Sequence, residues 1–254
     1  MKTYYYVHTG HRIGLDRFRR AVAILSKLDE DITLLTSDYR IAQVARDFGV
    51  EKSVGIDVVR NIPQIAKYGD KLIFDSDEAN PIMLEDMKEF FSLFVHISND
   101  TIAVEDKFFK QKTKSVKISY FFGDDDYEKD LEKHFDFIED INPHLQLGFY
   151  YFLDYEDMLK EKFVNHFEFE DYNEMIMNSE ILITCSPQAV LESLASGGKP
   201  IYIQREDYAR NFNKLLSDLN VPIIDSFNKV RLKDILETID KIEYKHIQNC
   251  NKIV

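Results

Sequence analysis

The side chains best suited to chemistry near the start of the chain lie between residues 8 and 20, in the stretch HTGHRIGLDRFRR. Gly10 and Gly14 allow a tight turn and a close approach of the backbone to a ligand. The imidazole of His11 titrates near neutral pH and can act as a general base, and Arg12 and Arg17 can bind an anion. The stretch therefore predicts an anion or substrate site that also offers a base.

The same stretch has a simpler interpretation, in which its charged residues belong to the surface. Arg19 and Arg20 are interpreted in this way, as a solvated helix face, and the histidines could equally be polar loop residues. Asp16 is expected to cap the helix that follows. The stretch contains no G-x-G-x-x-G pattern, so it is not the dinucleotide-binding fingerprint.

A second candidate site lies in residues 181–203, which read ILITCSPQAVLESLASGGKPIYI. Ser186 is expected as the N-cap of a helix and Pro187 as its first residue. Backbone amides at positions 186, 188 and 189 would then point at an anion such as a diphosphate. Glu192 lies four residues after Gln188 and therefore on the same helix face. On spacing alone, the favoured interpretation is an ordinary capped helix whose Glu192 faces water.

Two acidic segments each follow a predicted strand. Residues 75–78 read Asp-Ser-Asp-Glu, and Asp77 is the candidate there for a base or a sugar contact, although the segment could equally be a polar loop. The three carboxylates at 124–126 suit a helix N-terminus as a solvated acidic cap. Mg²⁺ binding is the alternative for them, because a cation would let a diphosphate approach.

The elements that must position these residues alternate along nearly the whole chain, short apolar strands with longer amphipathic helices, as in α/β proteins with parallel sheets. The predicted strands are Tyr4–His8, Ile32–Thr36, Ser53–Ile56, Lys71–Asp75, Leu93–Ile97, Val116–Phe122, Leu145–Tyr151, His166–Glu168, Ile181–Cys185, Pro200–Gln204 and Val221–Ile224. The predicted helices are Asp16–Leu28, Asp38–Phe48, Val58–Lys67, Met83–Phe91, Asp126–Ile138, Tyr172–Asn178, Ala189–Ser196, Asp207–Leu219 and Leu232–Ile239.

Eleven predicted strands are many for one sheet, so we expect two Rossmann-like domains facing a cleft. They comprise residues 1–112 and residues 113–254. A lysine-rich segment, Glu105–Ser115, is predicted as the linker.

Composition narrows the class of protein. The 254 residues include 32 Lys and Arg and 45 Asp and Glu, a net charge of −13, which argues against binding to nucleic acid or to anionic lipid. No apolar run is long enough to span a bilayer and the start lacks a secretion signal, so we expect a cytoplasmic protein without membrane insertion. Cys185 and Cys250 are interpreted as reduced thiols.

The 181–203 stretch resembles the nucleotide-sugar-binding half of GT-B fold glycosyltransferases. The resemblance implies that residues 113–254 form a nucleotide-sugar-binding domain and residues 1–112 a catalytic and acceptor domain. In that family a strand, a small-residue turn and a helix of the type E-A-L/S-A-x-G-x-P-x-I hold the nucleotide diphosphate. The resemblance implies that Glu192 holds the ribose hydroxyls. Residues 204–211 look like the family's D-Q-x-x-N-A motif, more loosely, which implies that Asp207 and Asn211 lie near the sugar.

In length and order the chain is similar to the PseG-type UDP-sugar hydrolases of the pseudaminic acid pathway and to MurG-like glycosyltransferases. This similarity covers most of residues 1–225, and only the 186–200 motif is specific. Residues 13–20 align with the family's I-G-x-G-H-I-x-R, which puts Arg17 at the position of the family's catalytic histidine. The base is then missing unless His11 supplies it, with Arg17 stabilising a leaving diphosphate.

We therefore expect a nucleotide-sugar-dependent glycosyltransferase or nucleotide-sugar hydrolase of bacterial surface glycan biosynthesis. Ser186, Gln188 and Glu192 would bind the donor, a sugar, a protein or water would be the acceptor, and no metal or other cofactor is expected. The alternative is a non-catalytic GT-B-like protein that binds a ligand or a partner through a degenerate site. The displaced histidine and the acidic turn favour that alternative, and the oligomeric state does not follow from the sequence.

Overall fold

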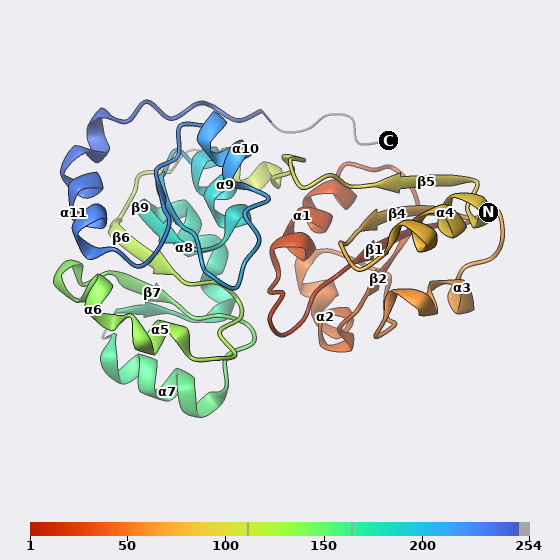
Figure 1. Ribbon diagram of the computed structural model, residues 1–254, viewed down its shortest axis with the longest axis horizontal. Coiled ribbons are helices and arrows are strands. Elements are labelled where there is room, and N and C mark those ends of the chain that lie inside the picture. Colours follow the sequence, from red (N-terminus) through yellow and green to blue (C-terminus); the bar gives the residue numbers. More distant parts are fainter. Residues whose placement is uncertain (111, 164, 249–254) are drawn as a thin grey trace. The chain divides into compact units, whose positions relative to one another are not determined.

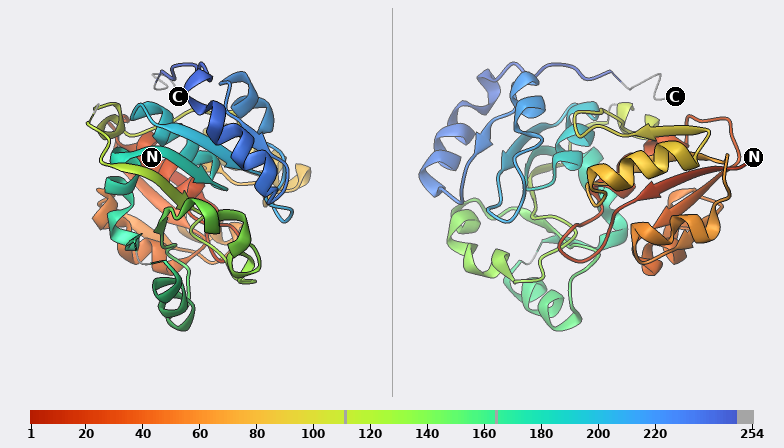
Figure 2. Two further views of the ribbon diagram at one scale, coloured as in Figure 1. Left: turned by 90° about the vertical axis from the view of Figure 1, so that its left-hand side faces the viewer. Right: turned by 45° about the vertical axis from the view of Figure 1, so that its right-hand side comes forward.

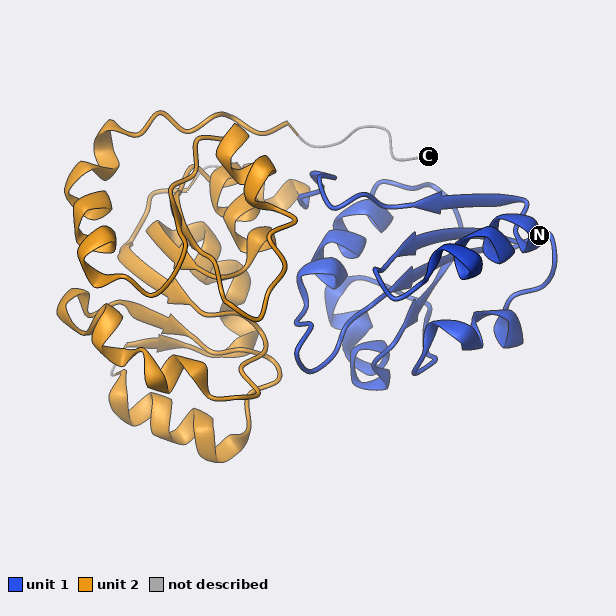
Figure 3. Ribbon diagram, viewed as in Figure 1, with its two compact units in different colours: residues 1–105, 250–254 blue, residues 106–249 orange. Residues whose placement is uncertain are grey.

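A computed structural model describes residues 1–110, 112–163 and 165–248. The chain divides into two compact units, of which unit 1 comprises Met1–Glu105 and unit 2 begins at Asp106 (Figure 3). The sequence analysis placed this boundary after residue 112. It lies earlier because the expected linker begins with a 3-10 helix, η3 (Asp106–Phe109), whose Phe108 is buried against unit 2.

Unit 1 is a parallel sheet with helices on its faces, and within the described residues its strands run in the order β3-β2-β1-β4-β5 (Figure 1). The strands are β1 (Thr3–Val7), β2 (Ile32–Thr36), β3 (Ser53–Gly55), β4 (Lys71–Asp75) and β5 (Leu93–His96). The helices are α1 (Asp16–Leu25), α2 (Tyr39–Val44), η1 (Ala45–Phe48), η2 (Val59–Asn61), α3 (Ile62–Ile65) and α4 (Pro81–Phe90).

The core of unit 1 follows from the alternation of side chains along its strands. Tyr4 and Tyr6 of β1 point to one face of the sheet, where they pack in one apolar cluster with Phe74, Ile62 of α3 and Met87 of α4. Successive residues point to opposite faces, so a continuous apolar strand such as YYYV is buried on both sides. Tyr4, Tyr5 and Tyr6 are all buried.

Unit 2 is a second parallel sheet, whose described strands run in the order β11-β10-β9-β6-β7-β8. The strands are β6 (Val116–Phe121), β7 (His144–Gln146), β8 (His166–Phe167), β9 (Ser179–Thr184), β10 (Lys199–Ile203) and β11 (Ile223–Ile224). The further helices are α5 (Asp130–Lys133), α6 (Phe135–Ile138), η4 (Glu139–Ile141), α7 (Leu153–Lys162), η5 (Phe169–Asp171), α8 (Tyr172–Asn178), α9 (Pro187–Ala195), α10 (Asn213–Asp218), α11 (Lys229–Thr238) and η6 (Ile239–Lys241). Figure 2 shows α5, α6 and α7, in green, beside the end of this sheet that β7 and β8 form.

All the predicted strands are present, whereas several predicted helices are shorter or interrupted. The helix predicted over 126–138 is two short helices, because the chain adopts a left-handed conformation at Lys129 and breaks again at His134. The helix predicted from Asp207 begins only at Asn213. The sequence analysis missed α7, whose apolar residues are too sparse to give a clear helical period.

Two remaining expectations concern the cysteines and the membrane. Cys185 is buried in the core of unit 2, and Cys250 lies outside the described residues. Among the described helices, none has the length and apolar character that a bilayer crossing requires.

The loops after β6 and β7 touch one another at a glycine. A Cβ atom on Gly148 would lie 2.5 Å from the carbonyl oxygen of Gly123 and 2.9 Å from the carbonyl carbon of Asp124. The amide of Tyr150 donates to the carbonyl oxygen of Asp124 at 2.8 Å, which holds the two loops together. A side chain at position 148 would therefore push the loop after β6 away.

We expect Gly148→Ala to destabilise the protein by about 1–3 kcal/mol, because the added methyl group meets backbone atoms that cannot rotate away. The measurement is the urea unfolding transition followed by circular dichroism. An unchanged midpoint would show that the two loops separate at no cost and would contradict this account.

Candidate functional site

The strand order of unit 1 reverses between β1 and β4, which is where ligands bind in open α/β sheets. The chain leaves β1 toward β2 on one side, and it enters β4 from β3 on the other. The two loops that follow, residues 8–15 and 76–80, therefore begin at neighbouring positions on the carboxyl edge. This edge brings together the histidine-rich and the acidic segments that the sequence analysis identified separately.

Asp75, the last residue of β4, is held by a buried ion pair at this edge. Its Oδ2 atom accepts hydrogen bonds from Arg20 Nε at 3.0 Å and from the Tyr5 hydroxyl at 3.1 Å, and its Oδ1 atom bonds Arg20 Nη2. The exposed fractions are 0% for Asp75 and 3% for Arg20. The interpretation of Arg19 and Arg20 as a solvated face is wrong, since Arg19 is buried as well.

Arg17 lies beside this pair and is neutralised by carboxylates. Its Nη2 atom forms an ion pair with Asp77, and its Nε atom lies 3.7 Å from Asp75 Oδ1. The structure thus brings the two predicted catalytic residues Arg17 and Asp77 together. Their pairing means that Arg17 would have to exchange a carboxylate for a phosphate in order to stabilise a leaving group.

The predicted turn after β1 forms as the glycines require. The amides of Ile13 and Gly14 both donate to the carbonyl oxygen of Gly10, and Gly10 pairs with Gly14 in a short antiparallel bridge. Both glycines have positive φ, and Arg12 between them has φ 68° and is exposed. Asp16 does not cap α1 as predicted, because it is the first helical residue and Leu15 occupies the N-cap position.

His11 contacts Arg40, which lies in the first turn of α2, the helix that follows β2. Its Nε2 atom lies 3.2 Å from Arg40 Nη1, and Arg40 is bound in turn by both carboxylate oxygens of Asp38. A guanidinium can only donate, so Nε2 of His11 accepts this bond and the ring carries its proton on Nδ1. In this arrangement Nε2 of His11 cannot take a proton from a substrate until Arg40 moves.

His8, the first residue after β1, has the environment of a general base. Its Nδ1 atom lies 3.7 Å from Oε2 of Glu78, and the same oxygen accepts hydrogen bonds from the hydroxyls of Tyr6 and Ser76. Burial lowers the pKa of His8 below its ordinary value, against the opposing effect of the Glu78 charge. The lowered pKa favours the neutral form of His8, which is the form that accepts a proton.

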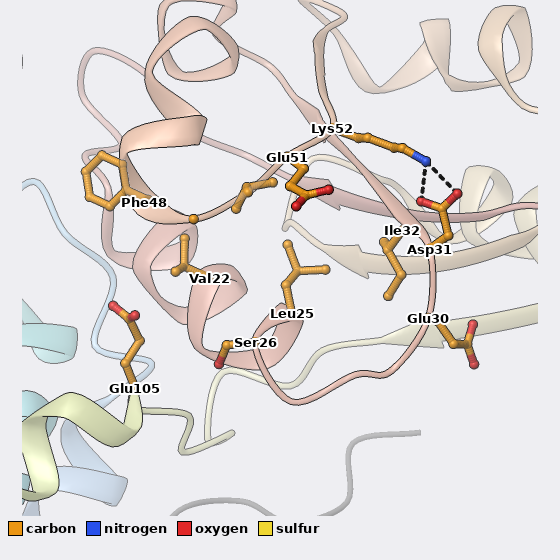
Figure 4. Close-up of a pocket in the computed structure, with 12 residues that line it drawn as sticks. Val22, Leu25, Ser26, Glu30, Asp31, Ile32, Phe48, Glu51, Lys52 and Glu105 are labelled. Carbon is orange, nitrogen blue, oxygen red and sulfur yellow. Dashed lines mark hydrogen bonds and ion pairs between the residues drawn. The ribbon is translucent and has the colours of Figure 1, made fainter.

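A pocket of about 630 Å³ in unit 1 lies away from this edge (Figure 4). It is formed by the end of α1, the start of β2 and the residues before β3, which together mark the amino edge of the sheet. Glu30, Asp31, Glu51 and Glu105 line it, and Lys52 is paired with Asp31. Because ligands of open parallel sheets bind at the carboxyl edge, we do not assign the reaction to this pocket.

In unit 2 the strand order reverses between β6 and β9, and the chain leaves β9 directly into α9. Ser186 is the N-cap of α9 as predicted, with its hydroxyl accepting from the amide of Ala189 at 3.0 Å. The amide of Ser186 donates to the Thr184 hydroxyl at 3.0 Å. Two of the three amides expected to face a diphosphate are thus used within the protein, which corrects that prediction.

Glu192 does not face water, contrary to the favoured interpretation from spacing. Its exposed fraction is 1%, and each carboxylate oxygen accepts a hydrogen bond from an uncharged donor. Gln188 Nε2 donates to Oε1 at 3.0 Å, and the Tyr172 hydroxyl donates to Oε2 at 2.6 Å. Burying a carboxylate is costly, and these two bonds offset part of that cost and determine the orientation of the group.

The acidic turn at 124–126 is buried and not solvated, which corrects its interpretation as a solvated cap. Asp126 accepts bonds from the amides of Asp130 and Leu131 and from the Tyr155 hydroxyl, the last at 2.5 Å. Burial raises the pKa of Asp126, against these hydrogen bonds. In the part of the chain that the structure describes, no group of three or more His, Cys, Asp or Glu residues could hold a metal ion.

Asp207 and Asn211 lie in the irregular segment between β10 and α10. Asp207 accepts two bonds from Arg205, Nε at 2.9 Å and Nη2 at 2.6 Å, and is about half exposed. Arg205 is buried between the rings of Phe122 and Tyr208 and donates to the carbonyl oxygen of Asp125 at 2.8 Å. Asn211 is exposed.

Sequence reasoning missed four residues that the structure places at these edges, namely His8, Glu78, Tyr172 and Arg205. His8 and Glu78 were noticed only as members of polar loops, and their spacing of seventy residues gives no local signal. Tyr172 was noticed only as the start of a helix. The alternation of strands with loops could have suggested Glu78, because it follows a strand that neighbours β1.

The comparisons with known proteins are structural. No family model matches the sequence, and no curated protein matches it. UDP-GlcNAc 2-epimerase of Methanocaldococcus jannaschii, solved with UDP-GlcNAc and UDP, is similar at a TM-score of 0.59 and 12% identity, over 100% of this chain and 97% of that chain. Spinosyn rhamnosyltransferase SpnG, solved with thymidine diphosphate, is similar at a TM-score of 0.57 and 8% identity, over 95% of this chain and 92% of that chain. Heptosyltransferase WaaC of E. coli, solved with ADP, is similar at a TM-score of 0.53 and 10% identity, over 95% of this chain and 99% of that chain.

The chain has the GT-B fold. The expected fold class, two parallel-sheet α/β domains of this type, is confirmed by these similarities. Identities this low show the fold and do not distinguish a PseG-type hydrolase from a MurG-like transferase.

We expect Asp75, the last residue of β4, and Asp77, in the loop that follows, to differ in their effect on stability. Asp75→Asn leaves the buried Arg20 charge without its carboxylate and should cost about 3–5 kcal/mol. Asp77→Asn, the matched control, removes a partly exposed ion pair and should cost at most about 1 kcal/mol. Urea unfolding of both variants measures the difference, and equal losses would refute the structural role of Asp75.

Proposed function

We propose that this protein binds a nucleotide-activated sugar through unit 2 and transfers the sugar to an acceptor or to water. The observation that supports this most is the buried carboxylate of Glu192, whose two oxygens are oriented by Gln188 and Tyr172. A carboxylate oxygen can accept more than one hydrogen bond, so a vicinal diol such as that of ribose can bind it as well. The nucleotides bound in the similar structures, UDP, thymidine diphosphate and ADP, agree with a nucleoside diphosphate as the donor's leaving group.

In this proposal unit 1 supplies the acid–base groups. His8, with the Glu78 carboxylate 3.7 Å from its Nδ1 atom, removes the proton from the acceptor hydroxyl or from water, and His11 is the rival base predicted from the loop. Arg12 and Arg17 stabilise negative charge on the leaving diphosphate, with Asp77 as the carboxylate that Arg17 releases. We place the enzyme among glycosyltransferases and nucleotide-sugar hydrolases of bacterial surface glycan synthesis.

A non-catalytic nucleotide-binding protein is the second candidate. The amides of Ser186 and Ala189 are used within the protein, and the acidic turn is buried in its own hydrogen bonds. Both observations reduce the number of groups that could stabilise a diphosphate as it leaves. Binding without turnover is the result that would favour this candidate.

The first test is thermal unfolding with UDP, ADP, GDP, CDP and dTDP and their common sugar conjugates, with and without Mg²⁺. One class of nucleotide should raise the unfolding temperature. A ligand present at 100 times its Kd raises the free energy of unfolding by about 2.7 kcal/mol. Glu192→Gln should weaken its binding about tenfold or more, because a hydrogen bond to a charged group contributes about 1.5–3 kcal/mol. The matched control is Glu180→Gln, at the amino end of β9, which should bind as the wild type does. No shift with any nucleotide would refute the proposal.

The second test is the reaction of the nucleotide sugar found in that panel, followed by NMR so that free sugar, glycoside and epimer are distinguished. His8→Gln should lower kcat by about 10²–10⁴-fold, as expected for loss of a general base, and His11→Gln should lower it less. A base works when neutral, and the pKa of His8 is lowered, so kcat/KM should fall with acid only below about pH 6.5. The reverse ranking of the two variants would assign the base to His11.

A further inference from the structure

Tyr172 joins two features of unit 2 that lie far apart in the sequence. It is the first residue of α8, and it is buried. Its ring meets the ring of Phe121 edge to face, with 5.4 Å between the centroids and 67° between the planes. Its hydroxyl donates to Oε2 of Glu192 at 2.6 Å. Phe121 is the last residue of β6, so Tyr172 holds the carboxylate of α9 next to the point where the strand order reverses.

Gln188 and Tyr172 donate to Glu192 from different elements, and this limits the orientation of the carboxylate. Gln188 lies one turn earlier on α9 and binds Oε1, while Tyr172 comes from α8 and binds Oε2. A donor on the same helix limits rotation of the side chain only relative to that helix. The bond from α8 also fixes it relative to the sheet, because the Tyr172 ring is packed on β6.

We propose that Tyr172 is a positioning residue, which holds Glu192 in the orientation that accepts both hydroxyls of a ribose and thereby selects ribonucleotides over 2′-deoxyribonucleotides. The inference rests on the proposed function and names the residue that makes its nucleotide subsite selective. A carboxylate held in one orientation can bind both hydroxyls of a diol at once, and it loses one of these bonds when the 2′-hydroxyl is absent. A carboxylate that rotates can satisfy a single hydroxyl almost as well as two, so it discriminates less.

A purely structural role for Tyr172 makes a different prediction. If the hydroxyl only satisfies a buried carboxylate, its removal lowers stability and leaves the preference for ribose unchanged. The ratio of the affinities for a ribonucleotide and its deoxy analogue therefore separates the two roles. Stability does not enter that ratio, because both ligands bind the same folded variant.

The experiment is isothermal titration calorimetry of the full chain with UDP, ADP, GDP and CDP and with the 2′-deoxy form of each. The variant is Tyr172→Phe, which keeps the ring that packs on Phe121 and removes the hydroxyl. The matched control is Tyr155→Phe in the same unit, which removes an equivalent phenol-to-carboxylate hydrogen bond, to Asp126 at 2.5 Å. Thermal unfolding of both variants confirms that they fold.

We expect the wild type to prefer one ribonucleotide over its deoxy form by about tenfold or more, as loss of one hydrogen bond to a charged group implies. Tyr172→Phe should reduce this preference to within about threefold, and Tyr155→Phe should retain it in full. A wild-type preference that survives in Tyr172→Phe would overturn the role of Tyr172 and leave the proposed function standing. Equal binding of the ribonucleotide and its deoxy form by the wild type would also overturn the role of Tyr172. Absence of all nucleotide binding would overturn both the role of Tyr172 and the proposed function.

Discussion

Parallel strand pairing is the constraint on which the rest of this structure depends. Neighbouring strands in both sheets run in the same direction, so the chain must cross from the carboxyl edge to the amino edge before each new strand begins. The loops that leave the strands therefore gather at one edge of each sheet. Where the strand order reverses, between β1 and β4 and between β6 and β9, two successive crossovers lie on opposite sides and leave space between neighbouring loops. The candidate residues of each unit lie at such a point.

Each unit has a buried carboxylate at the carboxyl edge of its sheet, and the two carboxylates accept hydrogen bonds from different kinds of group. In unit 1 Asp75 is neutralised by Arg20, an arrangement that stabilises the sheet edge against α1 and uses the charge internally. In unit 2 the uncharged groups of Gln188 and Tyr172 donate to the two carboxylate oxygens of Glu192. These hydrogen bonds orient the carboxyl group. This contrast is why we place nucleotide recognition at Glu192 and a structural role at Asp75.

The fold could be predicted well from the sequence, and the site only in part. Buried parallel strands are continuous apolar segments, and each of them was identified, as was α8 with its bounds. Arg20 was misjudged because charge is a poor guide to burial when the partner, Asp75, lies fifty-five residues away. The helix expected from Asp207 starts later because Arg205 holds that aspartate in an irregular segment, a contact that helical periodicity does not contain.

The sequence by itself determined the parallel α/β architecture, the turn at Gly10 and Gly14, and the Ser186 cap of α9, because these depend on residues close together in the chain. Only the tertiary structure decided which charged and polar groups contact one another. It paired Arg17 with Asp77, His11 with Arg40, His8 with Glu78 and Glu192 with Tyr172. The physical reason is that hydrogen bonds and ion pairs act over a few ångströms in space, and strand order brings together residues whose separation in sequence is large.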